Sequence, residues 1–368
     1  MRIGFDARMI NWKGVGTYSR NLLKQFAQVP GLEVVCFSNK ETNRYLPAGD
    51  NLIKTMLNEE VFSSRNLARI GQAVNRERVE LFHSPYVVAP TGLECPLLVT
   101  AHDIIPLLFP KSIPSFRLRR TYKGLLADAV HKADHIITVS TVSQSYLLAH
   151  FGLALGKVSV ILDGVSPKFT PRSEAEIEEV CAKYGIGRPH ILWLGEFVAH
   201  KNVTALVKAF AALSARIRSH YKLVLAGEKG ADWQQVRKET ESAGVGNLVN
   251  FPGFIADKDL PALYSSADLF VYPSLYEGFG LPPLEAMACG TPVVCSNTSS
   301  LPEVVGDGGL LVAPRSAALS AAITEVITNG SLRQRLKRRG RERAALFSWH
   351  TAADKTLDLY RELAAKEA

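Results

Sequence analysis

Two glutamates eight positions apart, Glu277 and Glu285, are the residues of this chain best suited to bind a ligand rich in hydroxyl groups. The string between them, residues 278–284, contains two glycines, a phenylalanine and the pair Pro282-Pro283. Because proline is best tolerated in the first turn of a helix, a helix is expected to begin there. Loop N–H groups and the positive end of a helix dipole attract an anion, and carboxylates accept hydrogen bonds from hydroxyl groups. The string therefore suits a nucleotide-sugar. The alternative is an ordinary acidic loop with a charged helix start.

Short β-branched runs alternate with helical stretches along the chain, which predicts parallel α/β sheets. The strands expected in the first half are residues 2–6, 33–37, 80–83, 97–101, 135–139 and 157–162. Those expected in the second half are residues 190–194, 222–226, 248–251, 269–272, 292–295 and 309–312. Each half is therefore predicted to be a doubly wound, Rossmann-like domain, with the ligand in the cleft between the two domains at the carboxyl ends of the strands.

The predicted domain boundary lies in a stretch rich in proline, glycine and polar residues, 166–189. The sequence predicts an N-terminal, acceptor-side domain over residues 1–170 and a C-terminal, nucleotide-sugar-binding domain over residues 171–348. The segment 349–368 is amphipathic, with apolar residues every three to four positions, and is predicted to be a helix.

The composition is that of a globular protein, with 47% hydrophobic and 21% charged residues among 368. No uninterrupted apolar run approaches the ~20 residues that a membrane span needs. The start of the chain reaches Asp6 too early for a secretory signal. The five cysteines are scattered, which argues against a zinc site or a disulfide framework and favours the cytoplasm.

The string from Tyr276 to Gly290 resembles the Glu-x7-Glu signature of retaining glycosyltransferases of family 4, which have the GT-B fold. The resemblance covers nearly the whole chain and is most specific over residues 190–315. It implies that Glu277 faces the hydroxyls of the donor sugar and that Glu285 holds the ribose. It also implies that the last helix crosses back onto the N-terminal domain, and that amides in the loop meet the sugar and the diphosphate, namely those around Phe279, Gly280 and Leu281.

Lys201 lies in a turn that opens with Gly195, between a predicted strand and a predicted helix. A lysine at a helix start is badly placed for the helix dipole unless it supports a bound anion. The position matches the basic residue of the family, so the resemblance implies that Lys201 binds the diphosphate; the alternative is a solvated loop lysine. Many family members carry arginine directly after the glycine, where this chain has Glu196.

Two further strings lie in the N-terminal half. Gly14 and Gly16 resemble the glycine loop of the family, near the diphosphate and the acceptor, although they fail as a dinucleotide-binding fingerprint. His102 and Asp103 stand at the end of an apolar strand, where burial is costly unless both are hydrogen-bonded. The resemblance implies that His102 contacts the donor sugar and that Asp103 has a supporting or acceptor-facing role. The alternative is that Asp103 caps the next turn and His102 packs against it.

The loop that contains Gly253, Phe254 and Ile255 resembles the family loop that holds the nucleotide base through backbone groups. Because backbone contacts do not distinguish a uridine from a guanosine donor, the donor is expected to be linked to either UDP or GDP. Asp257 and Asp259 follow, and we interpret them as the N-cap of the next helix rather than as metal ligands.

Two basic clusters contribute to the net charge of +8. Runs of charged residues usually form solvated faces. The first cluster also suits an anionic membrane, to which each well-placed cation contributes about 1 kcal/mol of binding free energy. Nucleic acid fits poorly, because neither cluster interleaves aromatic residues as a stacking surface would. The first cluster is Arg117, Arg119, Arg120 and Lys123, and the second is Arg333, Arg335, Lys337, Arg338, Arg339, Arg341 and Arg343.

The sequence thus predicts a retaining hexosyltransferase that needs neither metal nor cofactor. It would move mannose, glucose or a similar hexose from a nucleoside-diphosphate sugar to a saccharide or lipid-linked saccharide in polysaccharide biosynthesis, in the cytoplasm or peripherally on the inner face of the membrane. The expected catalytic residues are His102, Asp103, Lys201 and Glu277. One alternative is a glycoside phosphorylase or sugar epimerase of the same architecture. Another is a catalytically silent subunit that binds nucleotide-sugar or acts as a scaffold.

Overall fold

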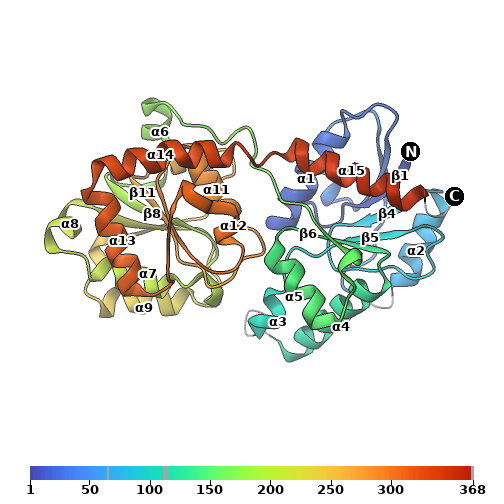
Figure 1. Cartoon of the computed structure of the whole chain (residues 1–368), viewed down its shortest axis with the longest axis horizontal. Helices are drawn as coiled ribbons and strands as arrows, with labels where there is room; N and C mark the ends of the chain where they lie inside the picture. The colour runs from blue at the N-terminus through green and yellow to red at the C-terminus, as the bar shows by residue number, and fades with distance from the viewer. Residues whose placement is uncertain (64–65, 111–114, 366–368) are drawn as a thin grey trace. The chain divides into compact units, whose positions relative to one another are not determined.

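The computed structural model describes residues 1–63, 66–110 and 115–365. The chain divides into two compact units (Figure 1). Unit 1 consists of Met1–Gly164 together with Ser348–Ala368, and unit 2 is Val165–Phe347. Unit 1 therefore contains both the start and the end of the chain.

Unit 1 is built on a seven-stranded parallel sheet in the order β3-β2-β1-β4-β5-β6-β7. The order reverses between β1 and β4, so the loops after these strands lie at a topological switch point. The strands are β1 (Arg2–Asp6), β2 (Glu33–Ser38), β3 (Leu52–Met56), β4 (Leu81–Ser84), β5 (Leu97–Thr100), β6 (His135–Thr138) and β7 (Val158–Val160).

The last helix of the chain, α15, packs against α1 and β4 within unit 1 (Figure 1). Its Tyr360 is fully buried and its hydroxyl lies 2.6 Å from Nδ1 of His83, whose Nε2 lies 2.8 Å from the hydroxyl of Thr100. Burial lowers the pKa of His83 to about 3, so the ring is neutral. The helices of unit 1 are α1 (Gly14–Phe26), α2 (Leu67–Arg76), α3 (Ile105–Leu108), α4 (Phe116–Lys132), α5 (Thr141–Phe151) and α15 (Trp349–Ala365).

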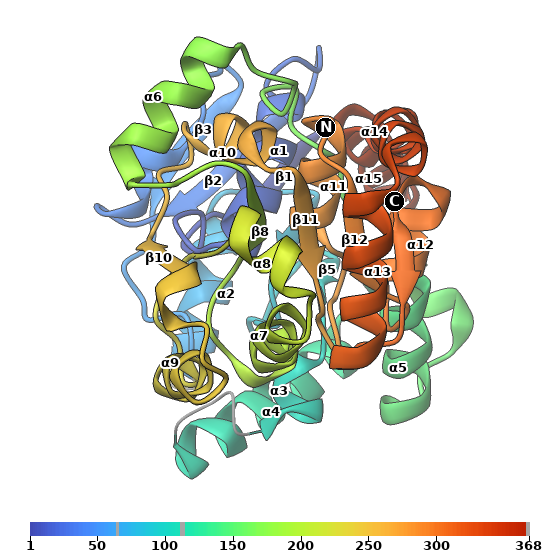
Figure 2. The ribbon, with the colours of Figure 1, turned by 90° about the vertical axis from the view of Figure 1, so that its left-hand side faces the viewer.

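Unit 2 is built on a six-stranded parallel sheet in the order β10-β9-β8-β11-β12-β13. Figure 2 shows β10, β8, β11 and β12 following one another across this sheet. The order reverses between β8 and β11, which places the loops after these two strands side by side at the carboxyl edge. The strands are β8 (His190–Leu194), β9 (Lys222–Ala226), β10 (Val249–Gly253), β11 (Leu269–Tyr272), β12 (Val293–Ser296) and β13 (Leu310–Val312).

Two groups of helices pack together around the sheet of unit 2. Helix α7 contacts α9 and α13, while α10 contacts α6 and α11, and α11 contacts α14. The helices are α6 (Glu174–Tyr184), α7 (Val203–Ala211), α8 (Ala215–His220), α9 (Trp233–Ser242), α10 (Leu260–Ser266), α11 (Leu281–Ala288), α12 (Leu301–Val305), α13 (Ser316–Thr328) and α14 (Gly330–Ala344). No helix within the described residues combines the length and the apolar character required to cross a bilayer.

The predicted α/β class is confirmed, and all twelve predicted strands are present with ends shifted by at most two residues. The sequence missed β3, an edge strand in which only Leu52 is buried while Lys54 and Met56 are exposed. The predicted capping role of Asp259 is wrong in its chemistry. Asp259 does stand at the N-cap of α10, but it makes no capping hydrogen bond; its carboxylate accepts hydrogen bonds from Lys183 (2.6 Å) and Tyr184 (2.8 Å).

Candidate active site

The loops that follow β8 and β11 are bonded to each other at the switch point of unit 2. The backbone N–H of Leu275 donates to the carbonyl of His200 (2.7 Å), and the side chain of Asn202 donates to the carbonyl of Pro273 (3.1 Å). Asn202 has φ +55° and stands at the N-cap of α7. These contacts fix residues 195–202 against residues 273–280, so side chains from both loops can converge.

Lys201 and Glu277 form an ion pair between these loops. The ammonium lies 2.7 and 2.9 Å from the two carboxylate oxygens and also donates to the hydroxyl of Tyr272 (2.8 Å). An ammonium has three N–H donors, and three acceptors surround this one. The side chains of Lys201 and Glu277 are only 16% and 9% exposed. Burial alone would raise the pKa of Glu277, but Lys201, with a smaller contribution from His200, holds it below its ordinary value.

The loop after Glu277 offers three backbone donors. The N–H groups of Phe279, Gly280 and Leu281 donate to no described residue. Gly280 has φ +126°, a conformation that favours glycine, and a Cβ there would lie 2.9 Å from Leu301. Helix α11 begins at Leu281, directly after this glycine. The three donors and the positive end of α11 thus lie in one short segment, as an anion site requires.

Two serines of the loop before α12 hold this segment in place. The hydroxyl of Ser299 donates to the carbonyl of Glu277 (2.6 Å) and accepts from its N–H (3.1 Å), while Ser300 contacts the carbonyls of Glu277 and Phe279. Sequence reasoning did not identify either serine. Residues 297–303 resemble the segment that follows the second glutamate's helix in the family. Nothing in these residues distinguishes a positioning serine from an ordinary loop residue.

Glu285 is the fifth residue of α11 and is partly exposed. Its carboxylate accepts a hydrogen bond from the hydroxyl of Tyr264 on α10 (2.9 Å). Burial raises the pKa of Glu285 to about 7, although this hydrogen bond favours the charged form. Glu285 therefore titrates near neutral pH.

The glycine-rich ends of β8, β9 and β10 meet at the same edge of the sheet. The N–H of Gly227 donates to the carbonyl of Gly253 (2.8 Å), and a Cβ on Gly227 would overlap the carbonyl of Gly195. Phe254 follows Gly253 and is 65% exposed, whereas Ile255 is buried. Sequence reasoning missed Gly227, whose φ of +132° is the reason for a glycine there.

The remaining candidates belong to unit 1. Helix α1 begins at Gly14, around which there is open space, so nothing in the described residues requires a glycine at that position. A Cβ on Gly16 would lie 2.4 Å from the carbonyl oxygen of Ile10. Gly16 thus permits a close approach of the chain to itself.

His102 is held as a neutral ring in unit 1. Its Nε2 lies 3.1 Å from the carbonyl of Pro85, and its ring packs edge-on against Tyr18. Burial lowers the pKa of His102 to about 4, so the ring is neutral. Because the carbonyl of Pro85 can only accept a hydrogen bond, Nε2 is assigned the proton and Nδ1 is left as an acceptor. Asp103 accepts a hydrogen bond from the N–H of Ile105 (2.8 Å), the first residue of α3, whereas the N-cap position itself is Ile104 and has no side-chain capping bond.

The structure therefore brings Lys201, Glu277 and the Phe279–Leu281 amides together, with Glu285 on the helix that follows. It places Gly14, Gly16, His102 and Asp103 in the other unit. The roles predicted for all these residues stay predictions. Two doubly wound α/β units, one of which has a helix start and loop amides that donate to no described residue at its switch point, form the architecture typical of two-domain proteins that bind nucleotides.

Comparisons with known proteins agree with this class. Residues 12–169 match the family model Glycosyltransferase Family 4, and residues 177–343 match Glycosyl transferases group 1. O-antigen chain mannosyltransferase B from Escherichia coli is 33% identical, over 99% of this chain and 100% of that protein. Sucrose-phosphate synthase from Thermosynechococcus elongatus has a similar fold, with a TM-score of 0.81 and 24% identity over 100% of both chains. HepE from Anabaena, in complex with UDP and glucose, has a TM-score of 0.77 and 21% identity over 99% of this chain and 100% of that chain.

The chain belongs to glycosyltransferase family 4 and has the GT-B fold. It is a hexosyltransferase of polysaccharide biosynthesis. The predictions of family, fold and enzyme class are therefore confirmed.

Replacement of Lys201 by methionine should destabilise the protein by about 3 kcal/mol, because it leaves the Glu277 carboxylate buried without a counter-charge. This loss lies at the lower end of the range that is usual when one partner of a buried ion pair is removed, because both side chains keep some exposure. Urea unfolding measures the effect, and the double variant Lys201→Met/Glu277→Gln should recover most of the loss. The matched control is Lys132→Met, at the exposed pair with Asp128, where less than about 1 kcal/mol is expected. Equal losses at both lysines would contradict the buried pair.

The raised pKa of Glu285 should make stability depend on pH. A carboxyl group whose pKa is raised in the folded state stabilises that state below its unfolded pKa of about 4.5, and this contribution is lost as pH rises through about 7. Wild-type protein should therefore lose stability relative to Glu285→Gln between pH 5 and pH 8, as measured by unfolding in urea at each pH. Glu178→Gln, at an exposed position of α6, should keep the wild-type profile. If the free energy of unfolding changed with pH in the same way for wild type and Glu285→Gln, the raised pKa of Glu285 would be refuted.

Proposed function

We propose that the protein transfers a hexose from a nucleoside-diphosphate sugar to a saccharide acceptor, with retention of anomeric configuration and without a metal ion. One observation carries the proposal: the N–H groups of Phe279, Gly280 and Leu281 donate to no described residue beside the buried Lys201–Glu277 pair. Preorganised donors of this kind stabilise negative charge where it develops, at low cost in reorganisation.

The leaving diphosphate is the group that gains charge in this reaction. The bond between the anomeric carbon and the phosphate oxygen breaks, the acceptor hydroxyl oxygen bonds to that carbon from the same face, and its proton passes to the phosphate. The three amides and the start of α11 bind the diphosphate. All three N–H groups of Lys201 have protein acceptors, so Lys201 reaches the diphosphate by exchanging one of them, while Glu277 binds hydroxyls of the hexose.

Neutral His102 accepts a hydrogen bond from a sugar hydroxyl through Nδ1, because its Nε2 lies at the carbonyl of Pro85. Asp103 supports the acceptor side. Glu285 holds the ribose, and the backbone of Gly253 to Ile255 holds the base.

The donor is a UDP- or GDP-linked hexose. Its hexose is mannose or glucose, which is supported by the relatives, since these include mannosyltransferases, and by the UDP and glucose bound to HepE. The acceptor is a saccharide, free or lipid-linked. Within the described residues no group of three or more His, Cys, Asp or Glu side chains is arranged to hold a metal ion. Metal independence is nevertheless a proposal, because a diphosphate can itself bring a cation.

A silent nucleotide-sugar-binding subunit is the second candidate. It is favoured by Glu196, which stands where many family members have arginine, and by the full set of acceptors around Lys201. Such a protein would bind nucleotide without turnover.

Incubation with UDP- and GDP-linked glucose and mannose, with saccharide acceptors and excess EDTA, should yield a product with the anomeric configuration of the donor, as read by NMR. Lys201→Met should lower kcat about 10²-fold or more, because it removes a cation from the developing charge. Lys132→Met is the control, and circular dichroism should show that both variants are folded at the assay temperature. An inverted product, inhibition by EDTA, or nucleotide binding without turnover of any donor would contradict the proposal.

Helix α4 suggests a peripheral position on the cytoplasmic face of an anionic membrane. Phe116 is 77% and Leu118 is 56% exposed, next to the exposed cations Arg117, Arg120 and Lys123. Apolar side chains beside cations suit the interface of an anionic bilayer. The cytoplasmic assignment is supported by four buried cysteines that are free thiols, Cys36, Cys181, Cys289 and Cys295.

The protein should therefore float with vesicles that contain phosphatidylglycerol but not with pure phosphatidylcholine. Phe116→Ser/Leu118→Ser should weaken flotation about tenfold, because it removes the two apolar contacts with the bilayer. Leu155→Ser, which removes another exposed leucine of unit 1, should not change it. Equal flotation of all three proteins would rule out α4 as the contact.

A further inference from the structure

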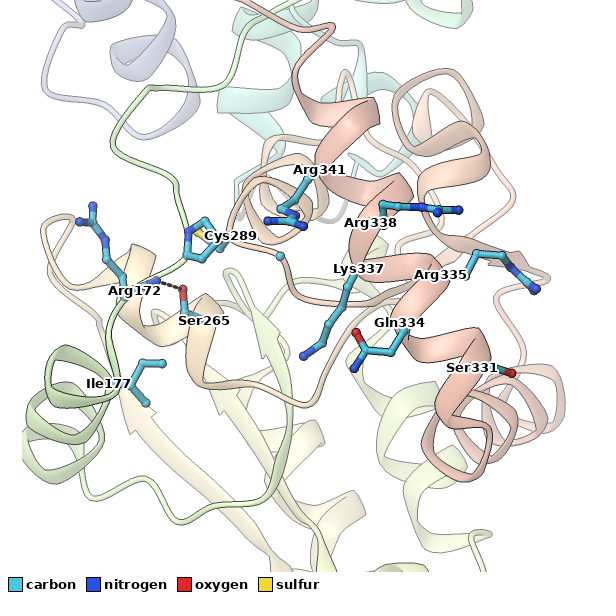
Figure 3. Close-up of a pocket in the computed structure, with 12 residues that line it drawn as sticks. Arg172, Ile177, Ser265, Cys289, Ser331, Gln334, Arg335, Lys337, Arg338 and Arg341 are labelled. Carbon is cyan, nitrogen blue, oxygen red and sulfur yellow. Dashed lines mark hydrogen bonds between the residues drawn. The ribbon is translucent and has the colours of Figure 1, made fainter.

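Unit 2 contains a cavity of about 760 Å³ on the side of α14 (Figure 3). Five of the twelve residues that line it are arginine or lysine, and none is acidic. Its wall combines α14 with Arg172, which precedes α6, with Ser265 on α10, and with Cys289 and Gly290 after α11. The second basic cluster of the sequence thus contributes to a concave surface rather than to a plain solvated face.

The protein balances the positive charge of this cavity only in part, since Arg172 and Arg338 each lie within 4.0 Å of a glutamate. Lys337 and Arg341 extend from α14 toward the side where Cys289 lies, whereas Arg335 and Arg338 extend away from it (Figure 3). Among the described residues, neither Lys337 nor Arg341 has a carboxylate within 4.0 Å. They are four positions apart on one helix, and like charges at that spacing destabilise a helix. An anion between them would relieve this repulsion.

Arg172 differs from these two cations because the protein already engages it. Its guanidinium donates to the carbonyl of Lys168 (2.6 Å) and lies 3.5 Å from Glu176. Arg172 therefore adds to the positive potential of the cavity, while Lys337 and Arg341 keep their donors for a ligand.

A purely structural explanation accounts for only part of this arrangement. The C-terminal end of α11 carries a partial negative charge, which a nearby cation stabilises. Arg341 fits that role, because its Cδ would lie 3.6 Å from a Cβ on Gly290, two residues after α11. Lys337 lies about one turn before Arg341 on α14, and capping of α11 by Arg341 does not account for a second cation beside the open cavity.

We propose that this cavity binds a soluble, phosphate-bearing small molecule, with the phosphate between Lys337 and Arg341. A phosphate offers several acceptor oxygens and up to two charges, which suits one guanidinium and one ammonium better than a carboxylate does. The neutral side chain of Gln334 also lines the cavity and can bond to the rest of the ligand. A concave site favours a small molecule over a flat membrane surface. The cavity shares no lining residue with the proposed transfer site, whose nearest member along the chain, Glu285, precedes Cys289 by four residues.

Isothermal titration of the full chain with pyrophosphate tests this proposal. Lys337→Gln/Arg341→Gln should weaken binding at one site by about tenfold or more, since each variant removes a charged donor. Arg216→Gln/Arg333→Gln, which removes the same charge from unit 2 outside the cavity, should change binding less than about twofold. Unchanged binding in the cavity variant would overturn the proposal.

Three further measurements exclude trivial explanations. Without ligand, the cavity variant should melt no lower than wild type, because it removes a repulsive pair; a lower melting point would indicate a structural role and would overturn the proposal. Lys201→Met should leave this site intact, so a failed transferase assay and a failed cavity site are distinguishable. Variant-dependent flotation with phosphatidylglycerol vesicles, without variant-dependent pyrophosphate binding, would assign the cations to a membrane and overturn the small-molecule proposal.

Discussion

The ion pair between Lys201 and Glu277 is the interaction on which the candidate site depends. Lys201 lies just before α7, where the positive helix end would repel it, and Glu277 offsets that repulsion in a buried setting. The pair joins the loops after β8 and β11, and hydrogen bonds from Ser299 and Ser300 then fix the backbone that follows. Because the two charges cancel, a bound dianion would depend on loop amides and the start of α11 for much of its stabilisation.

The ion pair exists because of the strand order in unit 2. β8 and β11 are neighbours in the sheet although two strands separate them in the sequence, and parallel pairing sends both of their following loops to the same edge. Glycines at the ends of the adjacent strands let the backbones approach closely at that edge, as the overlap that a Cβ on Gly227 would create shows. The rigid sheet therefore positions the loops, and the loops present the chemistry.

This dependence on strand order also determines what the sequence could and could not reveal. Residue patterns predicted the strands well, because buried parallel strands form apolar runs. The strand β3 was not predicted, because it is an edge strand whose side chains are mostly exposed or half-buried. The resemblance to the family identified Glu277 and Lys201 separately, each in a string of its own. Their direct contact was not predicted, since it requires that β8 lie next to β11. Asp259 shows the same limit, because its real partners, Lys183 and Tyr184, belong to α6, distant in sequence.

Helix α11 lies between two places that favour anions, and its length decides whether they influence each other. Its eight residues span about 12 Å at 1.5 Å per residue. The effect of a helix dipole fades within its first and last turns. The dipole of α11 therefore acts separately on charge at the loop amides before the helix and on charge at the cavity beside its other end. Coupling between the two sites through packing would run by way of the contacts of α11 with α10 and α14.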